Sequence, residues 1–369
     1  MASTERRYIE TLERFTAAIN FEEPDRVPTW DTLNNEELWR RFGTSSDPLK
    51  AAVETHRAVG IDVTRFYWWY SGFDWFRSKI IDFSRFMGLR PDEWEMKTKA
   101  GTSWINKRPF ADVEGLREHL PQPPDEDAVA AWYTPFFEKT IRAFAEKGLV
   151  LVGGLEAPLT DAYTYAGIDL LGKAIYLAPE LVTQLLDTFE KWCRIRAQLW
   201  AENDLGPAFF VGEDIAFGSG LMFAPNFLKA QVFPRIARIM QPLKKRGVKV
   251  IFHSDGALHS IMDYLVKELR VDGLNPIEPA AGMDVAKIKA EYGERLILVG
   301  NIDVSRLLPS GNPQDVEQAV KNTVAAAAPG GGFCLASSSE IHNAIPVENA
   351  LTMYQAAHKY GAYPRPRPP

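Results

Sequence analysis

The feature that most constrains the fold is the alternation of short β-rich runs with long amphipathic segments. In the second half of the chain the β-rich runs fall at 149–154, 208–212, 248–253, 271–275, 295–301 and 331–337. Segments with helical periodicity separate them, among them 179–203 and 227–247. Strands that alternate with helices of this length are typically parallel and joined by right-handed crossovers. With RVPTW at 26–30 and DVTRFYWW at 62–69, eight strands can be counted, which favours a closed (β/α)8 TIM barrel over an open doubly wound sheet.

One region, from about residue 73 to 110, interrupts this alternation. Its EWEMKTKAGTSWI alternates polar and apolar residues around a Lys-Ala-Gly turn, which predicts an antiparallel hairpin. We expect a small β-hairpin insertion at 73–110 and a single barrel domain over residues 1–369. The prolines of 362–369 exclude a helix there and leave either an extended arm or a disordered tail.

Composition narrows the class of protein. The chain has 369 residues, 46% of them hydrophobic and 24% charged, which is enough to bury a large core. A net charge of -6 provides no basic surface for nucleic acid. Two cysteines exclude a disulfide framework and fit a reducing compartment. Without an apolar signal segment or a membrane-length apolar run, we expect a cytoplasmic protein with no membrane partner.

Polar residues directly after the predicted strands are the first candidates for function, because in a barrel they point into a shared mouth. They are Glu156, Asp214, His253, Asp255, Glu278, Asn301, Asp303, Glu340 and His342. Any one of them could be a satisfied structural group, but their recurrence at one face predicts an active site. His253 and Asp255 are two residues apart, so an extended backbone places both side chains on the same side. This arrangement suits a metal site or a hydrogen-bonded His–carboxylate pair.

RFYWWYSGFDWF at 65–76 holds eight aromatic residues in twelve. Part of this segment must be core, but one strand cannot bury all eight side chains. The remainder either lines a pocket for a flat apolar ligand or covers a partner surface. The candidate substrate-binding residues are Trp30, Phe66, Trp68, Trp69, Tyr163 and Asn301. Cys193 and Cys334 are interpreted as small buried hydrophobes.

Four segments resemble the uroporphyrinogen decarboxylase superfamily over essentially the whole chain. They are RFTAAINFEEPDRVPTW at the first strand, FHSDG at 252–256, ERLILVGNID at 294–303, and GGFCLASSSEIHNAIPVENALTMYQAAHKYGAY near the C-terminus. The resemblance implies the barrel fold and a homodimer. In its cobalamin-dependent methyltransferase branch, zinc is held by His, Cys and a second Cys.

The departures from the family pattern bear on function. The porphyrinogen decarboxylases have an arginine-rich segment after the first strand, and RVPTWDTLNNEELWRR has no arginine immediately after it. Relative to the methyltransferases, His253 matches the first zinc ligand, Asp255 replaces the first cysteine, and Ser339 falls at the second cysteine, next to Glu340. An oxygen-rich set of His253, Asp255, Glu156 and Glu340 could still bind zinc or a similar cation.

The resemblance and its departures predict a methyltransferase-like enzyme. It would move a methyl group from an oxygen-bearing substrate, such as a methoxylated aromatic, to a corrinoid on a separate protein, with a metal activating the substrate oxygen. Asp214 or His342 would transfer the proton. One alternative is a metal-free decarboxylase of a small or tetrapyrrole-related carboxylate, using Asp214 or Asp303 to stabilise a protonated intermediate and His342 as the acid. A second alternative is a non-catalytic binding protein on the same fold.

Overall fold

Seven parallel strands form the wall of a barrel in the computed structural model, which describes residues 2–65, 75–99 and 102–363. Neighbouring strands are hydrogen-bonded in the order β12-β11-β10-β9-β6-β5-β2. Their bounds are Val63–Arg65 (β2), Val150–Glu156 (β5), Ala208–Gly212 (β6), Lys249–His253 (β9), Gly273–Asn275 (β10), Ile297–Ile302 (β11) and Phe333–Ser337 (β12). Every pair in this sheet is parallel, as the βα alternation of the sequence predicts.

The predicted strand at 26–30 closes the barrel. Thr29 pairs with Leu335 of β12 and Trp30 pairs with Val63 of β2, both in parallel. The amide of Trp30 donates to the Leu335 carbonyl at 2.8 Å, and the amide of Val63 donates to Thr29 at 2.9 Å. The segment makes single bridges instead of a continuous ladder, and Pro28 contributes to this because it has no N–H to donate. The closed barrel predicted from the sequence is therefore confirmed.

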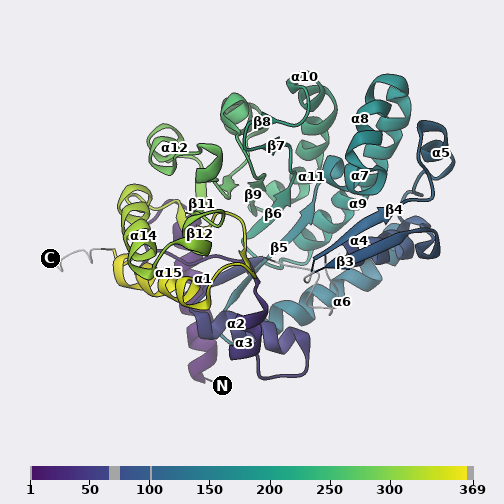
Figure 1. Ribbon diagram of the computed structural model, residues 1–369. Helices are drawn as coiled ribbons and strands as arrows, with labels where there is room; N and C mark the ends of the chain where they lie inside the picture. Colours follow the sequence, from purple (N-terminus) through teal and green to yellow (C-terminus); the bar gives the residue numbers. More distant parts are fainter. Residues whose placement is uncertain (1, 66–74, 100–101, 364–369) are drawn as a thin grey trace.

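Helices surround the barrel on its outer side (Figure 1). They are α3 (Pro48–Val59), α6 (Glu126–Ala145), α9 (Pro179–Glu202), α11 (Phe233–Lys245), η5 (Tyr264–Leu269), α12 (Val285–Tyr292), α14 (Pro313–Ala327) and α15 (Val347–Tyr360). Side-chain caps fix several starts: Asp125 accepts from the Ala128 amide at α6, and Asn312 accepts from the Asp315 amide at α14. None of the helices in the described ranges is both long enough and apolar enough to cross a membrane.

The first helix, α1 (Ala2–Ile19), lies across the N-terminal ends of the strands. Phe15, Ala18 and Ile19 belong to the apolar cluster that fills the barrel interior. Phe15 meets Trp30 edge-on, with ring centroids 5.6 Å apart. The bottom of the barrel is thus filled by apolar side chains, and the opposite mouth is left for polar groups.

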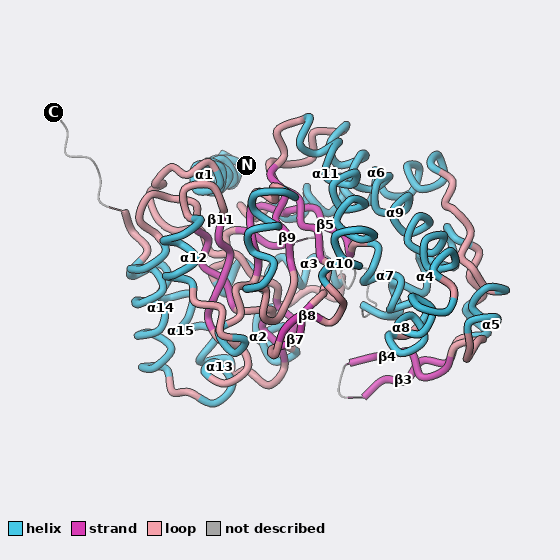
Figure 2. The backbone as a smooth tube through the Cα atoms, turned by 90° about the horizontal axis from the view of Figure 1, so that it is seen from above, coloured by secondary structure: helices cyan, strands magenta, loops and turns pink. Residues whose placement is uncertain are grey.

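Two segments, one from α4 to α5 and one formed by α7 and α8, build a lobe on one side of the barrel (Figure 2). It contains α4 (Trp75–Met87), η2 (Pro91–Glu93), β3 (Glu95–Lys99), β4 (Thr102–Lys107), α5 (Val113–Glu118), α7 (Pro158–Ala166) and α8 (Ile168–Leu177). The antiparallel pair of β3 and β4 confirms the predicted hairpin. The expected insertion at 73–110 also contains the helix α4, which the hairpin pattern did not reveal.

Short elements occupy the remaining connections. They are β1 (Leu33–Asn34), α2 (Glu36–Phe42), β7 (Ala216–Phe217), β8 (Gly220–Leu221), α10 (Pro225–Phe227), η3 (Leu228–Val232), η4 (His259–Ile261), η6 (Pro279–Ala281), α13 (Leu307–Ser310) and β13 (Ile341–His342). β1 and β13 pair in parallel above the barrel wall. Residues 364–369 of the predicted tail at 362–369 lie outside the described residues. Just before them, the hydroxyl of Tyr363 donates to the Ala328 carbonyl at 2.9 Å.

A buried ion pair joins the first strand to β2 through the DRVP sequence. Asp62, 5% exposed, accepts from both terminal nitrogens of Arg26 at 2.6 and 2.7 Å, and from Arg14 at 3.2 Å. The amide of Thr29 also donates to Asp62, at 3.0 Å. Burial acts to raise the pKa of Asp62, but the hydrogen bonds and charge of Arg26 outweigh it and hold the pKa below its usual range.

We expect Asp62→Asn to cost about 3–5 kcal/mol of unfolding free energy, because it leaves the Arg26 charge partly buried without its partner. The effect is present at neutral pH and shrinks as pH falls through the lowered pKa of Asp62, below about pH 4, where the wild-type carboxylate is itself protonated. Urea unfolding at several pH values measures both. Glu37→Gln is the matched control, since its pair with Arg40 is exposed to solvent and its removal should leave stability nearly unchanged. Equal effects of the two substitutions would contradict the prediction.

Candidate active site

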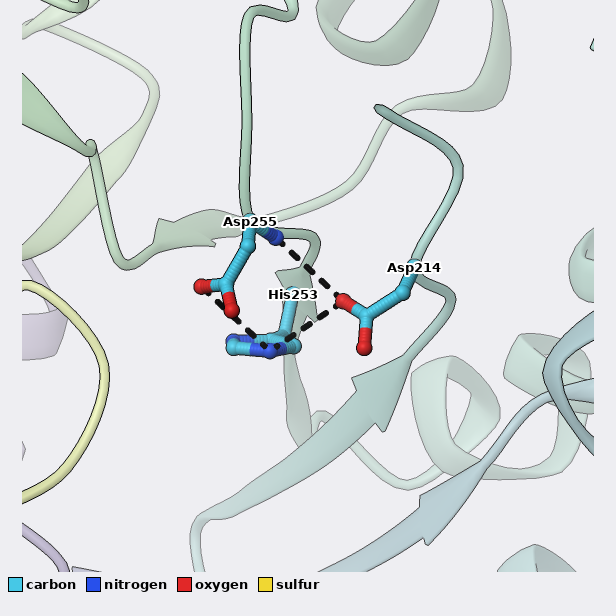
Figure 3. A group of neighbouring side chains, drawn as sticks. All are labelled: Asp214, His253 and Asp255. Carbon is cyan, nitrogen blue, oxygen red and sulfur yellow. Dashed lines mark hydrogen bonds and ion pairs between the residues drawn. The ribbon is translucent and has the colours of Figure 1, made fainter. Parts of the chain in front are cut away.

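Asp214, His253 and Asp255 meet at the mouth of the barrel (Figure 3). The Nε2 atom of His253 lies 3.4 Å from Oδ1 of Asp214 and 4.0 Å from Oδ1 of Asp255. One ligand atom from each residue can be chosen so that all three lie within 4.8 Å of one another. The backbone amide of Asp255 donates to Oδ1 of Asp214 at 3.3 Å and holds the two loops together.

Strand register explains why these side chains converge. Gly212, His253 and Asn275 end β6, β9 and β10, and His253 is paired directly with both neighbours. Asp214 and Asp255 each follow a strand end by two residues. This convergence is expected from the sequence, because the carboxyl ends of parallel strands share one face of the barrel. The structure brings together Asp214, His253 and Asp255 as expected.

Asn275 fixes the orientation and tautomer of the imidazole. Its Oδ1 lies 2.8 Å from Nδ1 of His253, and its Nδ2 donates to the Val299 carbonyl at 3.1 Å. An amide oxygen can only accept, so Nδ1 of His253 must carry a proton. In the neutral imidazole, Nε2 is then left with a bare lone pair that faces the two carboxylates. This is the arrangement of a metal-ligating histidine oriented by an outer hydrogen bond.

The electrostatics of the three residues follow from burial. Burial, with the nearby charge of Arg65, lowers the pKa of His253 to about 4, so the imidazole is neutral at pH 7. Asp214 and Asp255 are half-buried, with side chains 38% and 44% exposed. Partial burial raises the pKa of both, and the charge of Asp214 raises the pKa of Asp255 further. Oδ1 of Asp255 is buried and has no hydrogen-bond partner among the described residues. A lone pair and two carboxylates facing one point require a proton or a cation between them.

These three residues fit a divalent metal ion. One imidazole nitrogen and two carboxylate oxygens are ligand types that zinc accepts, and harder cations such as manganese accept the same oxygens. The partnerless Oδ1 of Asp255 and the bare Nε2 of His253 are the observations that favour a cation at this point. The expected ligands Glu156 and Glu340 are not part of this group of three.

Glu156 and Arg65 form the wall beside it. The carboxylate of Glu156 lies over Gly212, where an added Cβ would clash with its Oε2. Arg65 is buried, with its Cζ 4.2 Å from the ring centroid of Phe210, and Phe210 lies 4.9 Å from His253. The guanidinium therefore places a positive charge beside the carboxylates. Burial raises the pKa of Glu156, which the charges of Lys79 and then Arg65 counteract.

We expect Gly212→Ala to displace the Glu156 carboxylate while leaving the fold intact, since the clashing atom is the end of a flexible side chain. Activity should fall by about tenfold, as for the loss of other groups that flank a metal site, with a melting temperature close to wild type. Glu156→Gln is the comparison variant and should show a similar loss. An unchanged activity in both variants would show that Glu156 takes no part.

A second layer of buried acids positions α7 against the site. Glu213 is fully buried and accepts from the Thr160 amide at 2.6 Å, the Thr160 hydroxyl at 2.7 Å and the Leu159 amide at 3.1 Å. It thereby satisfies the first amides of α7. Below it, Lys79 of α4 forms a buried ion pair with Asp161 of α7. These contacts attach α7 to the end of β6 and α4 to α7, next to Asp214.

The side chains of two other expected catalytic residues, Asp303 and His342, form hydrogen bonds with backbone groups. Asp303 accepts from the Ser305 amide at 2.7 Å and so closes the turn after β11. His342 accepts from the Ala344 amide through Nδ1 at 3.3 Å, and its Nε2 lies 3.1 Å from the Val304 carbonyl. Both nitrogens of His342 thus have backbone partners, which leaves Asp214 as the expected proton-transfer residue that faces His253.

The expected substrate-binding residues lie in different places. Trp30 is buried in the barrel interior, and Asn301 meets Thr323 of the outer helix α14 at 3.4 Å. Glu340, which was expected as a metal ligand, accepts a hydrogen bond from Asn34 at 3.1 Å.

Tyr163, an expected substrate-binding residue, lines a cavity beside the site. Phe66, Trp68 and Trp69 lie outside the described residues. Cys193 and Cys334 are buried, as interpreted from the sequence.

Sequence reasoning missed Arg65 and Asn275. Arg65 falls within the predicted strand at 62–69, of which residues 66–69 lie outside the described residues. It is the last described residue of β2, and its guanidinium lies over Phe210, beside His253. Asn275 ends VDGLN, and its position beside His253 depends on the register between β9 and β10. Glu278 follows β10 as predicted, and it accepts from the Gly256 amide at 2.8 Å.

A closed parallel barrel whose polar residues gather at the C-terminal ends of its strands is the architecture of a TIM-barrel enzyme. Residues 10–360 match the family described as Uroporphyrinogen decarboxylase (URO-D), and the chain belongs to this family. The fold is also that of a methyltransferase from Methanosarcina mazei, with a TM-score of 0.72 and 20% identity over 95% of this chain and 98% of the other.

Two curated relatives match shorter segments. Uroporphyrinogen decarboxylase from Pseudoalteromonas atlantica is 35% identical over 80 residues, 22% of each chain. Methylcobamide:CoM methyltransferase MtbA from Methanosarcina acetivorans is 23% identical over 214 residues, 58% of this chain and 59% of the relative. The match thus spans about a fifth of the length of the decarboxylase and somewhat over half of the length of MtbA.

Proposed function

We propose that this protein is a methyltransferase that takes a methyl group from an oxygen-bearing substrate, such as a methoxylated aromatic, and delivers it to a corrinoid carried by a partner protein. The observation that carries the proposal is the convergence of Asp214, Asp255 and the bare Nε2 of His253 on one point. The fold shared with the Methanosarcina mazei methyltransferase supports the reaction class.

His253, Asp214 and Asp255 would hold zinc or a similar divalent ion. When bound, such an ion supplies Lewis acidity toward an ether or phenolate oxygen. Asn275 keeps Nε2 of His253 unprotonated, so its lone pair is available to such an ion. Phe210 and Tyr163 provide aromatic walls close to these groups.

The proposed reaction breaks the O–CH3 bond of the substrate and forms a bond between the methyl carbon and cobalt(I) of the corrinoid. The oxygen leaves with the electron pair of the broken bond and takes up a proton. A barrel mouth provides one open face through which a partner protein can present its corrinoid. We further propose that the protein acts in the cytoplasm, as a homodimer.

The test combines a metal assay with a methyl-transfer assay. Purified protein should contain about one divalent ion per chain, and incubation with methoxylated aromatics and a cobalt(I) corrinoid protein should release the phenol and form methyl-cobalt, which absorbance spectra follow. Chelation should abolish turnover, and zinc should restore it. Failure of every methyl ether and every phenol to exchange methyl with the corrinoid would refute the proposal.

One observation favours a second candidate, a metal-free decarboxylase of a small carboxylate substrate. Arg65 brings a buried positive charge to the mouth, where a substrate carboxylate could approach it. In that case Asp214 would stabilise a protonated intermediate. Release of carbon dioxide by chelator-treated protein would favour this candidate, whereas retention of metal through purification would count against it.

A further inference from the structure

The cavity that Tyr163 lines lies outside the barrel mouth, between β4 and the helices α7 and α8. Its volume is about 580 Å³, which is within the range of small-molecule sites. Most of its lining is apolar or aromatic: Trp104, Ile105, Phe110, Ile168 and Leu170. Trp104 and Ile168 are 39% and 40% exposed, so two large apolar side chains face water where a ligand could cover them.

One positive charge is built into this cavity. Arg108 lines it and is half-buried, with Nε donating to the Tyr165 carbonyl at 2.7 Å and Nη2 donating to the Thr164 carbonyl at 2.9 Å. These bonds hold the guanidinium flat against Gly167, where a Cβ would lie 3.4 Å from Cζ. The exposed carboxylate of Asp169 also lines the cavity, but neither it nor any other carboxylate of the described residues forms an ion pair with Arg108. Burial lowers the pKa of Arg108. A half-buried cation in an apolar wall is stabilised by an anion.

Tyr163 connects the cavity with the barrel mouth. Its side chain lines the cavity, and its helix α7 also carries Thr160, whose hydroxyl accepts from the Asp214 amide at 3.0 Å. Burial and then the charge of Asp214 raise the pKa of Tyr163. The cavity and the candidate site therefore share one wall.

We propose that this cavity binds the aromatic ring of a planar aromatic acid, with the guanidinium of Arg108 as the partner of its carboxylate. The ring would pack between Trp104 and the start of α8, and the end opposite the carboxylate would extend past Tyr163 toward Asp214. The substrate class is thereby narrowed to methoxylated aromatic acids, a step that rests on the proposed function.

The test measures binding alone, so that it does not depend on methyl transfer. Chelator-treated full-length protein is titrated by calorimetry with 4-methoxybenzoate and with its uncharged counterpart, 4-methoxybenzyl alcohol. We expect Arg108→Gln to weaken benzoate binding by about 10- to 100-fold and to leave alcohol binding unchanged, because only the acid loses a charge-assisted hydrogen bond. Arg117→Gln, on the exposed surface of α5, is the matched control and should bind both as wild type does.

A second variant tests the cavity without altering Arg108. Leu170→Trp fills the space and should abolish binding of both compounds, with folding checked by a melting curve. The inference is overturned if wild type binds no aromatic acid at millimolar concentration, or if folded Arg108→Gln or Leu170→Trp binds benzoate as wild type does. Arg108-dependent binding without methyl transfer would keep this inference and refute the proposed function. Methyl transfer with an unchanged KM in Arg108→Gln would do the reverse.

Discussion

His253→Ala should purify with less than about a tenth of the metal found in the wild-type protein. The substitution removes the nitrogen donor from a group of three and leaves two carboxylates, which bind zinc weakly without it. Under the proposed function, methyl transfer should fall on the order of 100-fold or more, because the variant would lack the metal that activates the substrate oxygen. Elemental analysis of the purified proteins and zinc titration of the chelated proteins measure the two effects.

The matched control is His259→Ala. This histidine is exposed on η4 and belongs to the same stretch of chain, so it separates loss of a ligand from loss of any imidazole. Circular dichroism should show both variants folded. If His253→Ala keeps the full metal content, the ion lies elsewhere. If the wild type itself holds no metal, the decarboxylase becomes the better hypothesis.

Asn275→Leu should weaken zinc binding by about 10- to 100-fold without removing any ligand. The side chain has nearly the same size, but it can neither accept the proton on Nδ1 of His253 nor donate to the Val299 carbonyl. The imidazole then loses the hydrogen bond that fixes its tautomer. At other metal sites, the loss of such a bond to a ligand weakens metal binding by about 10- to 100-fold. Two buried polar atoms also lose their partner, so the unfolding free energy should fall by about 1–3 kcal/mol.

Asn275→Asp separates these two effects. Its carboxylate still accepts from Nδ1 of His253, so metal binding should stay close to wild type, but it cannot donate to Val299 and stability should still fall. Titration with zinc and nitrogen NMR of the imidazole give readouts that a purely structural role would not move. Equal zinc affinities in wild type and Asn275→Leu would show that the tautomer of His253 does not depend on Asn275.

The fold could be predicted from the sequence because its signal is local and repeated. Each run such as LVLVGG or VKVIFH defines a strand, and the helices between them force parallel pairing. The hairpin was recognised for the same reason, since EWEMKTK and TSWINK alternate with a period of two. The helix α4 was not predicted because it begins at Trp75, inside the aromatic segment 65–76 that was interpreted as core and pocket lining.

The candidate site could be predicted only in part. Asp214, His253 and Asp255 each follow a strand end, so position in the sequence was sufficient to find them. Asp303 and His342 satisfy the same rule, but their hydrogen bonds to the Ser305 and Ala344 amides depend on loop conformations that strand position does not determine. Contributions such as that of Asn275 arise from register between strands, which a single sequence does not specify.

The closure of the barrel by its first strand has a consequence for how the chain folds during synthesis. Asp31 accepts hydrogen bonds from the amide and hydroxyl of Ser337, a partner 306 residues away. The ribosome exposes residues 27–31 long before β12 exists, so the first strand must wait with one edge unpaired while nearly all of the barrel is made. During that interval the barrel is open, so the apolar side chains of α1 cannot yet pack into its interior. Nascent chains stalled before residue 333 are therefore the species in which chaperones should find exposed apolar surface, and release of the last strand should end that exposure in a single step.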